Sequence, residues 1–225
     1  AVPLSYYRPG TGVQLVIEEL TSDSNLQIGI IGLGVGALAA YGESGDNYTF
    51  YELNPLVSDF AHKYFSYLSN SKADVQVKLG DARVSLQNEL DLGQKNAFDL
   101  LIIDAFSGDL IPTHLMTHEA FLLYQQHIKD HGALALHISN RHLSLLPVII
   151  NHSQTLDMQV MLFDTPGNGN GNEHDAQWVV LTNNTLLTQS PTLIYKQTVI
   201  AKDQYQKVLW TDDYSSLLAI LKVLN

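Results

Sequence analysis

The stretch IGIIGLGVGALAAY at residues 28–41 constrains the fold more than any other part of this sequence. The chain carries no charge from Asn25 to Gly42, and glycine occupies positions 29, 32, 34, 36 and 42. A membrane-spanning helix needs about 20 apolar residues, and each interior glycine disfavours helix by about 1 kcal/mol relative to alanine. The stretch therefore favours a buried strand that runs into a glycine turn over a helix that crosses a bilayer.

The segments on either side of the glycines support the same interpretation. LQIGIIGLG predicts a strand and a turn, ALAAYG predicts the first turns of a helix, and NYTFYELNP at 47–55 predicts a second strand. The glycines follow G-x-G-x-G, and Glu52 comes at the end of the second strand. Strand, glycine turn, helix, strand and terminal acid are the opening of a nucleotide-binding βαβ unit.

Alternating strands and helices continue along the chain and predict one α/β domain over residues 1–225. We expect a Rossmann-like three-layer sandwich with a mostly parallel seven-stranded sheet and a C-terminal antiparallel hairpin. The expected strands after the first two are 75–82, 98–106, 133–139, 159–165 and 176–183. The expected helices are 55–68, 83–90, 117–132, 143–156 with a kink or late start at Pro147, and 212–224.

Composition narrows the classes of function. Lys and Arg total 12 against 23 Asp and Glu, a formal net charge of −11, which disfavours sequence-independent binding to nucleic acid or anionic lipid. The chain contains no cysteine, so disulfides, thiolate nucleophiles and cysteine-ligated metals are excluded. The sequence opens at AVPLSYYRPG without methionine or a signal peptide, and we expect a fragment that lacks an N-terminal portion.

Candidate binding residues follow the predicted strands, because ligands of such sheets bind beyond the carboxyl ends. The missing Cβ atoms of Gly32, Gly34 and Gly36 allow the backbone to approach a ligand closely. The carboxylate of Glu52 can accept hydrogen bonds from both ribose hydroxyls of an adenosine. Asp81 can accept from an adenine amino group or cap the helix that follows it, and the sequence leaves both interpretations open.

Asp104 is the strongest candidate for a catalytic residue. It follows the apolar run FDLLII, at the tip of a strand expected to be buried on both faces. Its carboxylate would lie beside the glycine turn if the first and fourth strands are neighbours. Asp109 lies five residues further on and is a weaker candidate.

The nine histidines do not predict a metal site. His114 and His118, and likewise His127 and His131, have the i, i+4 spacing of helical ligands. No H-E-x-x-H pattern or third ligand accompanies either pair, so we expect ordinary surface or loop histidines and no metal.

Several of these segments together resemble the spermidine synthase-like proteins of the S-adenosylmethionine-dependent methyltransferase fold. The resemblance lies in IGIIGLGVGALAAYG, YTFYELNP, VKLGDARVSL and FDLLIIDAFSGDLIPTHLMTHEAF, and is strengthened by SYYRPGTGV, LHISNR and LWTDDYSSLL. DAFSGD and TDDYS are typical of a bacterial fused branch, in which such a domain can follow membrane-spanning segments.

This resemblance implies a role for each matching residue. Gly32, Gly34 and Gly36 would contact the amino-acid end of a nucleoside ligand, and Glu52 would hold its ribose. Asp81 and Ala82 would lie at the adenine edge. Asp104 would bind and deprotonate an attacking amine, and the acceptor-binding residues would be Asp109, Asp212 and Asp213.

The chain also departs from the family pattern. Ser107 stands where the second acid of the Asp-x-x-Asp motif would fall, and Asn54 stands where many relatives have Asp. The β-hairpin domain that precedes this fold in true synthases is missing from the sequence. The chain therefore lacks one acid of the motif that binds the amine in the family.

The resemblance predicts a transferase that uses S-adenosylmethionine or decarboxylated S-adenosylmethionine as donor and needs no metal. The first hypothesis is aminopropyl transfer to a small-molecule amine. Two alternatives stay open: a methyltransferase with another substrate, and a non-catalytic nucleoside-binding module. We expect no nucleic-acid partner and no direct membrane contact by this segment, allow for a homodimer, and expect a cytoplasmic domain whose full-length protein could be membrane-attached.

Overall fold

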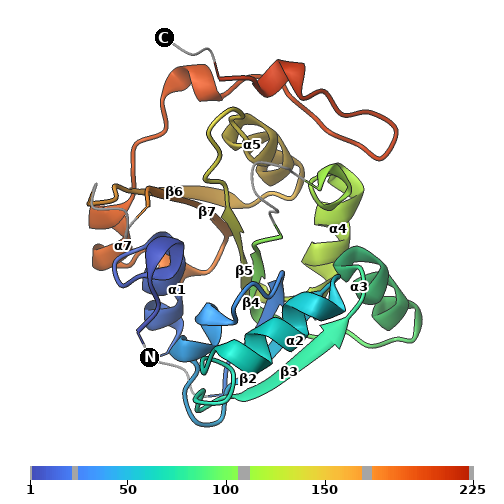
Figure 1. The fold of residues 1–225 in the computed structure, drawn as a ribbon. Coiled ribbons are helices and arrows are strands. Elements are labelled where there is room, and N and C mark those ends of the chain that lie inside the picture. The colour runs from blue at the N-terminus through green and yellow to red at the C-terminus, as the bar shows by residue number, and fades with distance from the viewer. Residues whose placement is uncertain (1, 22–24, 106–111, 169–173, 223–225) are drawn as a thin grey trace.

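The described residues form one seven-stranded sheet in the order β3-β2-β1-β4-β5-β7-β6 (Figure 1). The computed structural model describes residues 2–21, 25–105, 112–168 and 174–222. Strands β1 to β5 run parallel, and β7 is antiparallel to both β5 and β6, as the sequence predicted. The strands are β1 (Gln27–Ile31), β2 (Asn47–Glu52), β3 (Asp74–Leu79), β4 (Phe98–Ile103), β5 (Ile128–His137), β6 (Gln159–Thr165) and β7 (Ala176–Thr182).

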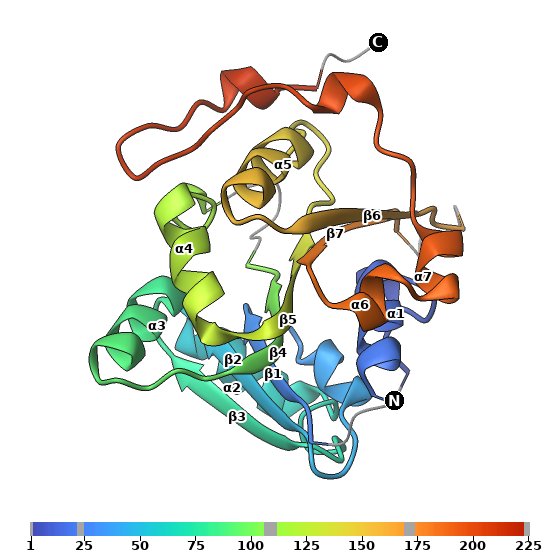
Figure 2. The same ribbon diagram turned by 180° about the vertical axis from the view of Figure 1, so that it is seen from behind.

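Helices cover both faces of the sheet and complete the expected three layers (Figures 1 and 2). One face carries α3 (Ala82–Asp91), α4 (His118–His127) and α5 (Leu146–Thr155). The other carries α1 (Gly12–Leu20), α2 (Pro55–Tyr64), α6 (Thr185–Thr188) and α7 (Pro191–Lys196). Short 3-10 turns are η1 (Ser5–Tyr7), η2 (Ala37–Tyr41), η3 (Thr113–Leu115), η4 (Lys202–Gln204) and η5 (Leu218–Ile220).

The central strand β4 shows why the sheet is apolar on both sides. Leu101 and Ile103 pack into the core beneath α3, α4 and α5, whereas Leu100 and Ile102 pack into the core on the opposite face. Successive side chains of a strand point to opposite faces, so a strand covered on both sides must be apolar at every position. Residues 100–103 of the run FDLLII meet this requirement, whereas Asp99 near the start of the strand is half-buried and accepts from Gln27 N–H and Lys129.

The stretch that opens the sequence analysis is a strand and a turn. Residues 27–31 form β1, and residues 37–41 form only the short 3-10 turn η2, where a longer helix was expected. Across the described parts of the chain, no helix has both the length and the apolar character that crossing a bilayer requires.

The helix predicted over 117–132 is wrong from Ile128 onward. Helix α4 ends at His127, and β5 begins at Ile128, which pairs with Phe98 of β4. A Cβ on Gly132 would lie 2.9 Å from the Phe98 carbonyl oxygen, so this glycine belongs to the close-packed strand pair. Pairing with a buried neighbour strand outweighs the helical periodicity of the local sequence.

The prediction of a helix over 212–224 is also wrong for its described part. Only η5 is helical there, because Thr211 and Tyr214 exchange hydrogen bonds in a turn and Lys222 N–H donates to the His142 carbonyl. The helix predicted over 55–68 ends already at Tyr64, whereas α5 begins near Pro147 as expected. Helices α1, α6 and α7 were not predicted.

We predict that Gly32→Ala destabilises the protein more than Gly34→Ala. A Cβ on Gly32 would lie 2.3 Å from the Asp104 carbonyl oxygen at a φ of +98°, whereas a Cβ on Gly34 at +53° would meet open space. Backbone strain alone should cost about 1–3 kcal/mol at Gly32, and the clash should add to it. The Gly34 variant should lose about 1–2 kcal/mol.

Urea unfolding of the two variants and the wild type measures this difference. Equal midpoints for both variants would contradict the close approach of Gly32 to β4.

Candidate active site

The carboxyl ends of β1, β2 and β4 open onto one cavity of about 440 Å³. The strand order reverses between β1 and β4, which is where ligands bind in open α/β sheets. The predicted residues that line this cavity are Gly32, Gly34, Glu52, Asp81, Ala82 and Asp104, and Tyr7, Leu33, Asn54 and His114 line it with them.

The glycine turn adopts the backbone that its sequence requires. Gly32, Gly34 and Gly36 all have positive φ. Gly32 N–H donates to the Tyr51 carbonyl at 2.9 Å, which joins the turn to β2. Gly36 does not line the cavity. It caps the start of η2 and faces the side chain of Leu68.

Glu52 bridges the end of β2 and the glycine turn. Its side-chain Oε2 accepts from Leu33 N–H at 3.0 Å, and its Oε1 accepts from Asn54 N–H at 2.8 Å. Glu52 is only 8% exposed, so these two backbone donors fix the carboxylate in place. Each oxygen keeps a further lone pair, which can accept from a ligand hydroxyl.

Asp81 caps α3 and also faces the cavity. Its carboxylate accepts from Val84 N–H at 3.0 Å, and its other oxygen lies 2.9 Å from His114 Nε2. Burial works to raise the pKa of Asp81, but the hydrogen bonds from Val84 and His114 outweigh it and the pKa is lowered. Asp81 therefore stays ionised. It caps α3, as one of the two interpretations predicted. A contact with adenine would have to use the lone pairs of the Asp81 carboxylate that Val84 and His114 leave free.

Asp104 is held from both sides by side chains that the sequence analysis did not assign. Tyr7 O–H donates to Oδ2 at 2.5 Å, and His137 Nδ1 lies 2.8 Å from Oδ1. A carboxylate only accepts, so Nδ1 carries the proton when Asp104 is ionised. Burial, followed by the charge of Asp104, raises the pKa of Tyr7 well above its ordinary value. Tyr7 is consequently a neutral donor.

The partners of Asp104 are themselves anchored. Arg8 donates to the carbonyls of His174 and Pro166 in the β6–β7 connection, which fastens η1 and Tyr7 to the sheet. The ring of His137 stacks on Trp178 with centroids 4.8 Å apart. Tyr7 belongs to the segment SYYRPGTGV, and His137 belongs to LHISNR. Both segments strengthen the family resemblance, and the structure places one residue of each beside Asp104.

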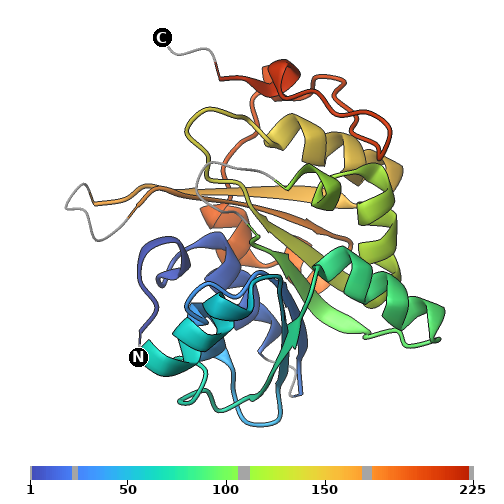
Figure 3. The same ribbon diagram turned by 45° about the vertical axis from the view of Figure 1, so that its right-hand side comes forward.

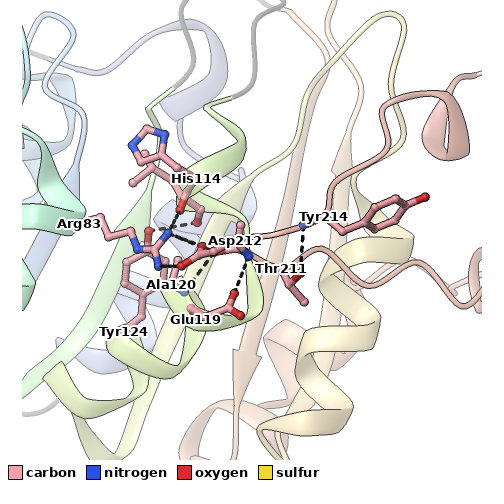
Figure 4. Close-up of polar contacts among 10 residues, drawn as sticks. Arg83, His114, Glu119, Ala120, Tyr124, Thr211, Asp212 and Tyr214 are labelled. Carbon is pink, nitrogen blue, oxygen red and sulfur yellow. Dashed lines mark hydrogen bonds and ion pairs between the residues drawn. The ribbon is translucent and has the colours of Figure 1, made fainter.

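The predicted acceptor residues do not join this cavity. Asp109 and Ser107 lie outside the described residues. Asp212 is bound by both terminal nitrogens of Arg83, at 2.7 and 2.5 Å, beside the first turns of α3 and α4 (Figure 4). Asp213 is exposed. The structure thus brings the predicted nucleoside residues other than Gly36 together with Asp104, but not Asp212 or Asp213.

A second, polar cavity of about 600 Å³ lies beyond the ends of β5 and β7. Ser139 in its wall lies 2.8 Å from His137 Nε2, so Asp104, His137 and Ser139 form a continuous hydrogen-bonded row. Two carboxylates, Asp164 and Asp175, line this cavity with Tyr6. The sequence analysis did not single out these acids, since they stand in and beside a loop that is polar throughout.

The histidines have structural partners. His114 pairs with Asp81, and His127 is fully buried with Nε2 2.9 Å from the Leu86 carbonyl. The expectation of a surface or loop position is therefore wrong for His127, and it is equally wrong for the buried His137 of β5 and His152 of α5. In the parts of the chain that the structure describes, no three His, Asp or Glu side chains converge as metal ligands.

Comparison with known proteins points to one class of fold. No family model matches the chain. It is 36% identical over 110 residues to the polyamine aminopropyltransferase of Vibrio vulnificus, a match of 47% of this chain and 35% of that protein. It is 30% identical over 108 residues to the N-terminal histidine N-methyltransferase of Emericella nidulans, a match of 48% of this chain and 19% of that protein. The matches therefore span about a third or less of these relatives.

Solved structures match over more of the chain. A probable spermidine synthase from Corynebacterium glutamicum superposes with a TM-score of 0.59 at 16% identity, covering 78% of this chain and 67% of that one. Human methyltransferase-like protein 13 in complex with SAH superposes with a TM-score of 0.58 at 16% identity, covering 92% and 94%. The chain thus has the S-adenosylmethionine-dependent methyltransferase fold, and about half of its length is similar in sequence to a polyamine aminopropyltransferase.

Proposed function

We propose that this protein is a spermidine synthase-like transferase that binds an S-adenosyl sulfonium donor and transfers an aminopropyl group to an amine. One observation carries the proposal: Glu52, fixed by Leu33 N–H of the glycine turn, shares a cavity with Asp104. A ribose-binding carboxylate and a catalytic carboxylate thereby face the same ligand space. The volume of about 440 Å³ is in the range of small-molecule sites.

The donor's position follows from the chemistry of the lining. Both ribose hydroxyls would donate to Glu52, and the adenine edge would lie at Asp81 and Ala82. The sulfonium end would pass Gly32 and Gly34, whose bare backbone leaves room for it, and reach Asp104.

Aminopropyl transfer is a displacement at the carbon next to sulfur. The amine nitrogen forms the new N–C bond, the C–S bond breaks, and its electron pair leaves with sulfur as a neutral thioether. The attacking ammonium has an intrinsic pKa near 10, as lysine does, and must first lose a proton. Asp104 takes that proton in our proposal, and Tyr7 and His137 hold its carboxylate in one orientation.

The acceptor would enter from the second cavity. Asp164 and Asp175 there would accept from the ammonium groups that do not react, and Ser139 connects that cavity to His137 and Asp104. Arg141 and Lys222 line the same cavity and offset the formal charge of the two carboxylates, so the proposed acceptor site rests on where the carboxylates lie and not on a net negative charge. It does not require Asp212 or Asp213.

The comparisons support this class of donor. One solved spermidine synthase of the same fold, with a TM-score of 0.50, is in complex with the transition-state analogue AdoDATO, and the human methyltransferase-like protein holds SAH. The second candidate function is methyl transfer from S-adenosylmethionine. The 30% identical stretch in a histidine N-methyltransferase favours this alternative.

We predict that Glu52→Gln weakens donor binding about tenfold or more, because a hydrogen bond to a charged group is worth about 1.5–3 kcal/mol. Isothermal calorimetry with decarboxylated S-adenosylmethionine and S-adenosylmethionine measures the affinities. Aminopropyl transfer requires the decarboxylated donor to bind more tightly, and methyl transfer requires the reverse. Glu43→Gln is the control, since the exposed Glu43 side chain pairs with Lys72 and does not line the cavity. Wild-type protein that binds neither donor would refute the proposal.

We predict that Asp104→Asn lowers turnover about 100-fold or more and changes the donor's dissociation constant by less than about threefold, as expected for loss of a general base. Turnover is measured over a panel of di- and polyamines with both donors. Asp91→Asn is the matched control, because Asp91 is exposed, accepts from Gln87 and does not line the cavity.

Full activity of the Asp104→Asn variant would contradict the assignment of Asp104 as the general base. Donor binding by the wild type without turnover on any amine would instead support a nucleoside-binding module.

A further inference from the structure

The turn at 211–214 is fastened to the helices beside the first cavity by a network of polar contacts (Figure 4). Arg83 Nη1 and Nη2 donate to Asp212 Oδ1 and Oδ2 at 2.7 and 2.5 Å. Thr117 O–H donates to Asp212 Oδ1 at 2.7 Å, and Asp212 N–H donates to Glu119 at 2.9 Å. Four contacts therefore bind one residue of the C-terminal segment to α3 and α4.

The segment that carries Asp212 is anchored from below. Trp210 is fully buried in the core beneath α3, α4 and α5, and its carbonyl accepts from His118 N–H at 2.8 Å. Figure 3 shows the C-terminal segment crossing beside α4 and α5 on this face. Asp212 is thus presented to Arg83 by a fixed backbone, which lowers the entropy cost of a bidentate pair.

The same guanidinium reaches toward the ligand cavity. Arg83 Nη1 also donates to the His114 carbonyl at 2.9 Å, and His114 Nε2 lies 2.9 Å from Asp81 Oδ2. His114 and Asp81 both line the cavity. The hydrogen-bonded path therefore runs from Asp212 through Arg83 and His114 to the carboxylate at the expected adenine end.

The charge distribution agrees with this path. The hydrogen bond to Asp212 is the largest cause that raises the pKa of Arg83, and the hydrogen bond from Arg83 is the largest cause that lowers the pKa of Asp212. Both groups stay ionised near neutral pH. Loss of the Asp212 charge would leave Arg83 without its bidentate partner, and the loop of η3 that carries His114 would lose its fixed donor.

We propose that Asp212 is a positioning residue for nucleobase recognition, which holds Asp81 in place through Arg83 and His114. This inference rests on the proposed binding of an adenosine in the first cavity. It assigns Asp212 to the donor side of the reaction, whereas the family resemblance assigned it to the amine. In this proposal, the 2.9 Å contact of His114 Nε2 with Asp81 Oδ2 sets the direction in which the Asp81 carboxylate accepts from the adenine amino group.

Two ligands that differ only at the base separate positioning from general support of the fold. S-adenosylhomocysteine carries the 6-amino group, whereas S-inosylhomocysteine carries an oxygen there. The wild type should prefer the adenosine compound by about tenfold, the worth of one good hydrogen bond to a charged group. Calorimetry should show that Asp212→Asn weakens binding of the adenosine compound and leaves the inosine compound unchanged, so that the preference falls below about threefold.

Asp213→Asn is the matched control, since Asp213 is exposed and makes no hydrogen bond or ion pair among the described residues. It should keep the full preference. Arg83→Lys should behave as Asp212→Asn does, because an ammonium cannot bind Asp212 in two places and reach the His114 carbonyl. Asp212→Glu should restore part of the preference.

Each outcome has one meaning. An unchanged adenine preference in Asp212→Asn, or equal weakening of both compounds, overturns the positioning role while the proposed function stands. A wild type that binds neither these two compounds nor decarboxylated S-adenosylmethionine refutes the proposed function itself. Thermal unfolding of each variant identifies a loss of folding, and in that case Arg83→Lys and Asp212→Glu decide the inference.

Discussion

The close approach of Gly32 to the end of β4 is the constraint on which the site depends. Asp104 N–H donates to the Ile31 carbonyl at 2.9 Å, and a Cβ on Gly32 would lie 2.3 Å from the Asp104 carbonyl oxygen. Only a residue without a side chain can turn there with positive φ. This approach places the glycine turn between the carboxylates that follow β2 and β4. A larger residue would push the two halves of the cavity apart.

The two carboxylates are held by different means, and this difference suits their proposed roles. Glu52 accepts from two backbone N–H groups, so its orientation follows directly from the fold. Asp104 accepts from two side chains, Tyr7 and His137, whose own positions depend on η1 and β5. Backbone donors provide a rigid contact for a ligand that is bound in the same way in every cycle. Side-chain donors form a polar row that leads from Asp104 to the second cavity.

The sequence predicted the parts of the site that depend on local pattern. A glycine turn after an apolar strand, an acid after the next strand and an acid after a doubly buried strand each fix a place along the chain. Parallel order then brings those places to one edge of the sheet. Gly32, Gly34, Glu52, Asp81, Ala82 and Asp104 line the same cavity for this reason.

Residues whose position depends on distant contacts could not be found this way. Tyr7 reaches Asp104 across 97 positions of sequence, and Arg83 reaches Asp212 across 129. The prediction that the helix continues over 128–132 was wrong for a related reason, because Ile128 pairs with Phe98 in the sheet. Local periodicity carries no information about such partners. The Asp212 role implied by the family motif also omitted Arg83, which occupies both of its carboxylate oxygens.

The most direct test of the central claim is a crystal structure of the protein in complex with S-adenosylhomocysteine. The account predicts both ribose hydroxyls within hydrogen-bond distance of the Glu52 carboxylate, about 2.6–3.0 Å, with the sulfur end beside Gly32 and Gly34. A nucleoside bound elsewhere, or a Glu52 carboxylate turned away from the ribose, would contradict it.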